Sequence, residues 1–126
     1  MLPAHLSSRL TQFDYAELGP HASALLAELR GAARAGLPLS ILVLAATLVD
    51  VVAHEEAGPA GYIDGIDFAY AGNKPALAWL RHQRNTTLHH EGPADGLMGE
   101  EPALSWHWRD AERAVETLLD YLDDLA

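Results

Sequence analysis

The sequence contains no cysteine, and this absence excludes several kinds of chemistry at once. A chain without thiols forms no disulfide, offers no thiolate ligand to zinc and has no cysteine nucleophile. Such a chain suits a reducing compartment. The first residues also lack the basic and then apolar pattern of a signal peptide. We therefore expect a cytoplasmic protein.

Basic residues are also scarce, because 8 Lys and Arg stand against 18 Asp and Glu, for a formal net charge of −10. Taken alone, this balance argues against nucleic acid, since phosphate contacts need cations. The charges are unevenly spread, however. No acidic residue lies between Asp67 and Glu91, and this gap contains Lys74, Arg81 and Arg84. The sequence therefore predicts one electropositive patch on an acidic body.

Long apolar runs are limited to one, residues 37–53. It is at the short end of what a bilayer span needs, and it contains Asp50 near one end. A helix buried among other helices fits this run better, and we expect no membrane association. With 126 residues, 49% of them hydrophobic, the chain has the size and the apolar content of a single domain, residues 1–126.

Proline, glycine and helical periodicity divide the chain into helices. The pattern predicts helices over residues 20–35, 38 to about 56, 74 to about 91 and about 102–125, with a short N-terminal helix around 7–18. Pro20 and Pro75 lie in first helical turns, Asn73 caps the third main helix, and Gly36 ends the first. Residues 57–73 are expected to form a loop. The predicted fold class is an all-α, four- to five-helix up-and-down bundle.

The third main helix contains the most informative motif, in the stretch WLRHQRNTTLHHEG (residues 79–92). Arg84 is followed directly by Asn85 and, after three further residues, by His89. This pattern near the end of the penultimate helix of a bundle resembles the HEPN superfamily, whose signature is an arginine, four to six residues and a histidine. The resemblance implies a HEPN-like bundle.

The resemblance also implies an activity, the cleavage of RNA without a metal or other cofactor. A neutral His89 would take the proton of the ribose 2′-hydroxyl, and Arg84 would stabilise the charge on the phosphoryl oxygens. Asn85 would orient the histidine or bind a phosphate oxygen. The family implies a homodimer with a shared cleft, and a cognate antitoxin or nucleotidyltransferase as a partner. The chain is thus a possible metal-independent endoribonuclease of a toxin–antitoxin type.

The spacing of the motif raises a geometric question. On a regular helix, residues five apart lie about 140° apart, so Arg84 and His89 do not share a face. His82, Asn85 and His89 do share one stripe. Productive geometry then requires either local unwinding near His89, close to Gly92-Pro93, or an arginine from a second protomer.

Two further readings of the same residues remain open. In one, Arg84 pairs with a carboxylate such as Glu28 or Asp50 in a non-catalytic bundle that binds a nucleotide or a protein, and His89 and His90 only favour the helix dipole. In the other, His54 and Glu55 at one helix end combine with His89 and Glu91 at another to bind a metal ion.

Asp50 is a special case, because a carboxylate within an apolar helix needs a partner. Arg84 and Arg81 are the expected partners, and Asp50 would then orient the motif. Alternatively, Asp50 occupies the exposed face of a core helix. The supporting residues predicted around the motif are thus Asp50, Arg81, His82 and His90.

Overall fold

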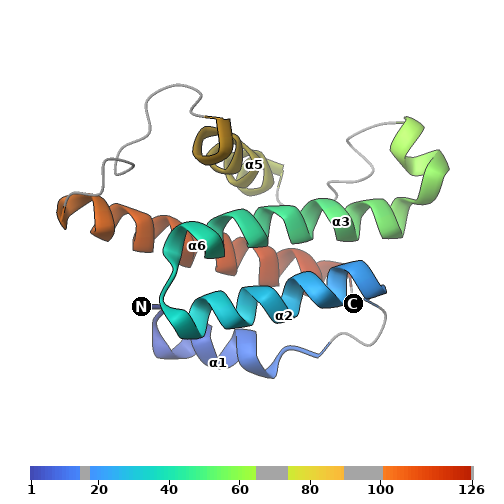
Figure 1. The fold of residues 1–126 in the computed structure, drawn as a ribbon. Helices are drawn as coiled ribbons and strands as arrows, with labels where there is room; N and C mark the ends of the chain where they lie inside the picture. The colour runs from blue at the N-terminus through green and yellow to red at the C-terminus, as the bar shows by residue number, and fades with distance from the viewer. Residues whose placement is uncertain (15–17, 65–73, 90–100, 126) are drawn as a thin grey trace.

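The connection between the first two long helices shows how closely the chain follows its glycine and proline signals. In the computed structural model, which describes residues 1–14, 18–64, 74–89 and 101–125, helix α2 (Pro20–Ala35) ends at Gly36. Gly36 has a φ of 74°, a left-handed conformation that glycine adopts without strain, and its N–H donates to the carbonyls of Ala32 and Ala33. Helix α3 then begins at Pro38, so α2 and α3 lie antiparallel (Figure 1).

The described residues form five α-helices and no strand. Besides α2 and α3 (Pro38–Asp64), they are α1 (Ala4–Gln12), α5 (Lys74–His89) and α6 (Glu101–Leu125). The all-α fold class is therefore confirmed. In Figure 1, α1, α2 and α3 alternate in direction, whereas α6 runs in the same direction as α3 and α5 is seen nearly end-on, crossing them.

Two predicted helix boundaries were wrong. The N-terminal helix was expected around residues 7–18, but α1 begins directly after Pro3 and ends before Phe13, whose ψ of 128° is extended. Helix α3 was expected to end near Glu56, yet it continues to Asp64. A proline inside a helix removes one hydrogen bond and bends the axis rather than always ending the helix. Figure 1 shows the last turns of α3 bent away from the rest. The predicted cap Asn73 and the C-terminal signal Gly92-Pro93 lie outside the described residues.

Helix α3 is the centre of the bundle. It packs against α2, α5 and α6, while α1 packs against α2 and α6. One apolar cluster takes side chains from all five helices, among them Leu10, Leu29, Leu48, Leu80 and Leu118, which are almost completely buried. Pro38–Glu55 is long and apolar enough to cross a membrane by length and composition, and half of that window is buried inside the bundle.

The short helix α1 is fixed to α2 by one arginine. Arg30 donates from Nε to the carbonyl of Leu10 at 3.0 Å and from a terminal nitrogen to the carbonyl of Phe13 at 2.5 Å. The last carbonyls of a helix have no partner within it. Arg30 therefore supplies the C-terminal cap of α1 from a neighbouring helix.

We predict that Arg30→Met lowers the free energy of unfolding by about 1 to 2 kcal/mol, because it leaves partly buried carbonyls without a donor. Urea denaturation followed by circular dichroism measures this difference. Arg34→Met is the matched control, since Arg34 is exposed on the last turn of the same helix. Equal stability of the two variants would show that the cap contributes nothing.

A second prediction concerns Asp110, in α6. Burial raises the pKa of this carboxyl, and the positive charges of His107, Arg113 and Arg109 lower it by less. Because the pKa of Asp110 is raised in the folded state, the contribution of Asp110 to the free energy of unfolding is greatest below the unfolded pKa of 3.8. This contribution is lost as the pH rises through the raised pKa.

Asp110→Asn should therefore raise the melting temperature at pH 7, and this advantage should shrink as the pH falls below the usual carboxyl range. Thermal melts at several pH values, with Asp124→Asn at an exposed site of the same helix as the control, test this. A gain that is largest at acidic pH would contradict it.

Candidate functional site

The candidate site is built around the carboxylate of Asp50, in the middle of α3. One oxygen accepts a hydrogen bond from Arg81 at 3.3 Å, and the other accepts one from Arg84. The side chains of Asp50 and Arg84 are 24% and 19% exposed, so this ion pair is largely shielded from water. The expectation that an arginine of the motif helix neutralises Asp50 is confirmed.

The local sequence explains why Arg84 faces α3. Arg84 follows Leu80 by four residues and Leu77 by seven, so the three share one side of α5. Both leucines are buried against the core. Packing of these leucines therefore turns the guanidinium of Arg84 toward α3, where Asp50 lies.

Asn85 is also part of this cluster. Its Oδ1 accepts a hydrogen bond from the Nη2 of Arg84 at 3.3 Å, so the first two residues of the motif contact each other. Within the described contacts, Arg84 uses one N–H on each terminal nitrogen, one to Asp50 and one to Asn85. A guanidinium has five N–H groups. Arg84 is therefore fixed in orientation and retains donors for a ligand.

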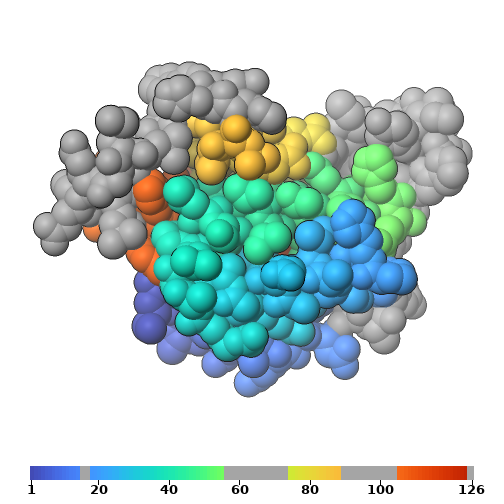
Figure 2. All heavy atoms as spheres, viewed as in Figure 1, coloured from blue at the N-terminus to red at the C-terminus, as the bar shows by residue number. Residues whose placement is uncertain are grey.

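Arg84 opens onto a pocket between α2, α3 and α5, with a volume of about 360 Å³. The walls come from the start of α2, from one face of α3 and from Arg84: His21, Thr47, Asp50, Val51, His54, Glu55 and Arg84. Figure 2 shows α2, α3 and α5 side by side on one face of the molecule. On α3, the spacing of Thr47, Asp50 and His54 places them on one face. The pocket thus combines an arginine, two histidines and two carboxylates.

The second carboxylate of the pocket caps α2. Glu55 accepts a hydrogen bond from the backbone N–H of Gly19 at 2.9 Å, at the N-cap of that helix. A Cβ on residue 19 would lie 2.6 Å from this carboxylate, so any larger residue there would force the Glu55 side chain to shift. The negative charge also lies at the positive end of the helix dipole. Both carboxylates of the pocket are therefore engaged, Asp50 by two arginines and Glu55 by the start of α2.

Of the other predicted histidines, only the side chain of His82 lies within the described residues, and it does not line the pocket. His82 is exposed on α5. His89 is the last residue of α5, and its side chain, like His90 and Glu91, lies outside the described residues. Helix α5 is continuous from Lys74 to His89, so local unwinding, one of the two alternatives proposed near His89, does not occur within these residues. On this regular helix the two positions lie about 140° apart, with Arg84 turned toward α3.

The predicted metal site can be followed only in part. His54 and Glu55 line the pocket, but the side chain of His89 and all of Glu91 lie outside the described residues. Within the part of the chain that the structure describes, no three His, Asp or Glu side chains are grouped closely enough to hold a metal ion.

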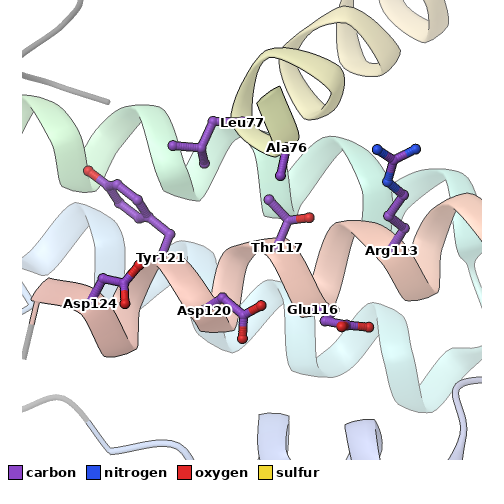
Figure 3. A pocket seen from close by; sticks show the side chains of 8 residues that line it. All are labelled: Ala76, Leu77, Arg113, Glu116, Thr117, Asp120, Tyr121 and Asp124. Atoms are coloured by element: carbon purple, nitrogen blue, oxygen red, sulfur yellow. The ribbon is translucent and has the colours of Figure 1, made fainter. Parts of the chain in front are cut away.

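A second pocket, of about 270 Å³, lies between α5 and α6 (Figure 3). Its charged residues are Arg113, Glu116, Asp120 and Asp124, and Thr117 points toward Ala76 of α5. Asp120 is also paired with Arg9, 2.9 Å away. This pocket carries an excess of negative charge and contains no motif residue, so it is a poorer site for a phosphate.

His21 is the pocket residue that the sequence pattern did not single out. A signal for it exists in the antiparallel hairpin. Gly19 and Glu55, which are hydrogen-bonded, are each 18 residues from Leu37 at the turn. Counting outward from that turn pairs the first turn of α2 with the segment that contains His54. The residues that face each other across this hairpin are therefore what places His21 beside the segment that contains His54.

No protein-family model, no curated protein and no solved structure matches this chain. The site is therefore interpreted from its own geometry and chemistry.

We predict that Asp50 and Arg84 are energetically coupled. A double-mutant cycle with Asp50→Asn and Arg84→Met should give a coupling free energy of about 1 to 2 kcal/mol, because the pair is largely shielded from water. Denaturant unfolding of the four proteins provides the measurement. The parallel cycle with Arg81→Met is the internal comparison, and it should give a smaller value, since the Arg81 side chain is 38% exposed. Coupling that is zero for Arg84 would mean that the ion pair does not hold α5 to α3.

Proposed function

We propose that this chain is a HEPN-like helical-bundle protein that binds RNA at Arg84, Asn85 and His89 and cleaves it without a metal ion. One observation carries the proposal. Arg84 is held by Asp50 and bonded to Asn85, at the edge of an open pocket. An arginine whose orientation is fixed in advance loses little freedom when it binds a phosphate, which is what stabilisation of a developing charge needs.

The reaction would be a transesterification within the RNA strand. His89 would remove the proton from a 2′-hydroxyl, and that oxygen would attack the adjacent phosphorus. The bond from phosphorus to the 5′-oxygen would break, leaving a 2′,3′-cyclic phosphate and, after protonation, a 5′-hydroxyl. Arg84 would stabilise the negative charge on the phosphoryl oxygens through its remaining N–H donors. The need for a 2′-hydroxyl restricts the substrate to RNA.

The proposal includes a homodimer. Arg84 points toward α3, and His89 lies about 140° further round the regular helix α5. A complete site therefore draws Arg84 from one protomer and His89 from its partner. Two patches would also double the cations available to an RNA strand, which matters for a chain of net charge −10.

A second candidate function rests on the same ion pair. Because Asp50 neutralises Arg84, the pair also suits a structural arginine that holds α5 to α3 in a non-catalytic bundle that binds a nucleotide or a protein. The two candidates differ in what Arg84→Met does. In the catalytic case it removes cleavage by a correctly folded protein, and in the structural case it changes stability alone.

We predict that the purified protein cleaves single-stranded RNA in the presence of a chelator and leaves DNA of the same sequence intact. Arg84→Met and His89→Ala should each reduce the rate at least about 100-fold. Gel analysis of end-labelled RNA gives the rates and identifies the cyclic phosphate end. Arg34→Met and His5→Ala, at exposed positions on other helices, are the matched controls.

Mixing the two inactive variants tests the shared site. If Arg84 and His89 come from different protomers, a mixed dimer of Arg84→Met and His89→Ala contains one intact site, and part of the activity returns. No return of activity places both residues of a site in one protomer. Absence of cleavage by the unaltered protein rejects the ribonuclease proposal and leaves the non-catalytic bundle.

A further inference from the structure

We infer that the pocket between α5 and α6 binds a linear polyamine, with one ammonium group at Thr117 and the next along the acidic residues of α6. Nothing in this pocket belongs to the motif around Arg84. The site is therefore separate from the proposed ribonuclease site and does not depend on it.

The hydroxyl of Thr117 is the group that points to a ligand. Thr117 lines the pocket, and the residue is only 8% exposed. Its hydroxyl makes no hydrogen bond to any described residue, whereas Thr47 and Thr87 each donate to a backbone carbonyl one turn earlier. A shielded hydroxyl without a protein partner is costly, and it has two lone pairs to offer to a donor. A ligand N–H in the pocket would satisfy it.

The charges around this hydroxyl favour a cationic ligand. Glu116, Asp120 and Asp124 all line the pocket. Asp120 is paired with Arg9, but Arg9 also pairs with Asp123, 2.6 Å away, so two carboxylates share one guanidinium. Neither Glu116 nor Asp124 has an ion pair with a described residue. The acidic side of the pocket therefore keeps a negative charge that a ligand can neutralise.

The one cation among the lining residues is held at one end of the pocket. The guanidinium of Arg113 lies over the ring of Trp79, 4.0 Å from its centre, and this stacking is itself favourable. Figure 3 shows Arg113 and Asp124 at opposite ends of the pocket. They are 11 residues apart on α6, or about 16 Å along the helix axis. Arg113 therefore leaves the Asp124 end negative.

The spacing of the carboxylates suits a chain of charges better than a metal ion. Glu116, Asp120 and Asp124 follow one another at intervals of four residues, which is about 6 Å of helix rise per step. A divalent metal ion needs its oxygen ligands within about 2 to 2.6 Å of one centre. Among residues 1–14, 18–64, 74–89 and 101–125, no three such side chains are grouped closely enough to hold one. A polyamine instead places separate ammonium groups opposite separate carboxylates.

The wall and the size of the pocket fit the alkyl chain that joins those ammonium groups. Ala76 and Leu77 of α5 lie across the pocket from α6 and supply apolar contacts for methylene groups (Figure 3). The volume of about 270 Å³ is just below the usual range for drug-sized ligands, which suits a slim chain.

The test is isothermal titration calorimetry of the unaltered protein at low salt with spermidine, with butylamine and with magnesium ions. Spermidine should bind at least about 10-fold more tightly than butylamine, because its linked ammonium groups meet more than one acceptor at once. Magnesium ions should bind more weakly than spermidine. Added salt should weaken the binding of spermidine, since the carboxylates are exposed.

Thr117→Val is the decisive variant. Valine has nearly the shape of threonine, so the variant is expected to fold, yet it removes the hydroxyl and should weaken spermidine binding at least about 10-fold. Thr87→Val makes the same change outside the pocket and should leave binding unaltered. Glu116→Gln, at an exposed position, should weaken binding by about 3-fold, whereas Glu28→Gln, exposed on α2, should not.

Two results overturn the inference: no binding of spermidine by the unaltered protein, or equal binding by the Thr117→Val and Thr87→Val variants. Butylamine that binds as tightly as spermidine overturns the assignment of a polyamine, because a single ammonium group then suffices. Magnesium ions that bind more tightly than spermidine overturn it in favour of a metal. Spermidine binding that Thr117→Val and Glu116→Gln weaken and their controls retain supports the inference, whether or not the protein cleaves RNA.

Discussion

The ion pair between Asp50 and Arg84 is the constraint on which the arrangement of this bundle depends. A carboxylate in the middle of the most apolar helix is costly unless a cation accompanies it. The cation comes from α5, so the requirement for a partner fixes where α5 crosses α3 and which way it is rotated. Leu77 and Leu80 bury the same side of α5, so apolar packing and charge neutralisation specify one orientation. The pocket exists at this crossing because the start of α2 lies beside it.

Agreement between local signals and the structure was best where a single residue decides the backbone. Gly36 ended α2, Pro38 began α3, and the pairing of Asp50 with the arginines followed from the cost of an isolated buried charge. The helix ends that were predicted wrongly, those of α1 and α3, do not depend on a single local residue. Helix α3 continues past Glu56 to Asp64, and the end of α1 is capped by Arg30 from another helix, which no local pattern reveals. The residues of the candidate site differ in the same way in how well the sequence predicts them. Asp50, Arg81 and Arg84 were accessible from sequence, whereas His21 required knowledge of which residues face each other across the α2–α3 hairpin.

Where α5 crosses α3, Arg84 can both hold the two helices together and donate hydrogen bonds to a ligand. Its hydrogen bonds to Asp50 and Asn85 hold the guanidinium in place, and these two bonds do not use all five of its N–H groups. A motif arginine that is rigid and only partly exposed binds an oxyanion with little loss of conformational freedom. A net charge of −10 limits non-specific attraction of nucleic acid, so the proposed binding of RNA would depend on local geometry rather than on overall charge.

The bond from Gly19 to Glu55 closes the open end of the α2–α3 hairpin, opposite the covalent turn at Gly36. The first turn of α2 is consequently a small unit whose local opening separates Glu55 from its donor and carries His21 away from the pocket. The exchange of the amide hydrogens in that turn therefore reports on the state of the pocket, and any ligand that touches both helices slows this exchange without contacting the amides themselves.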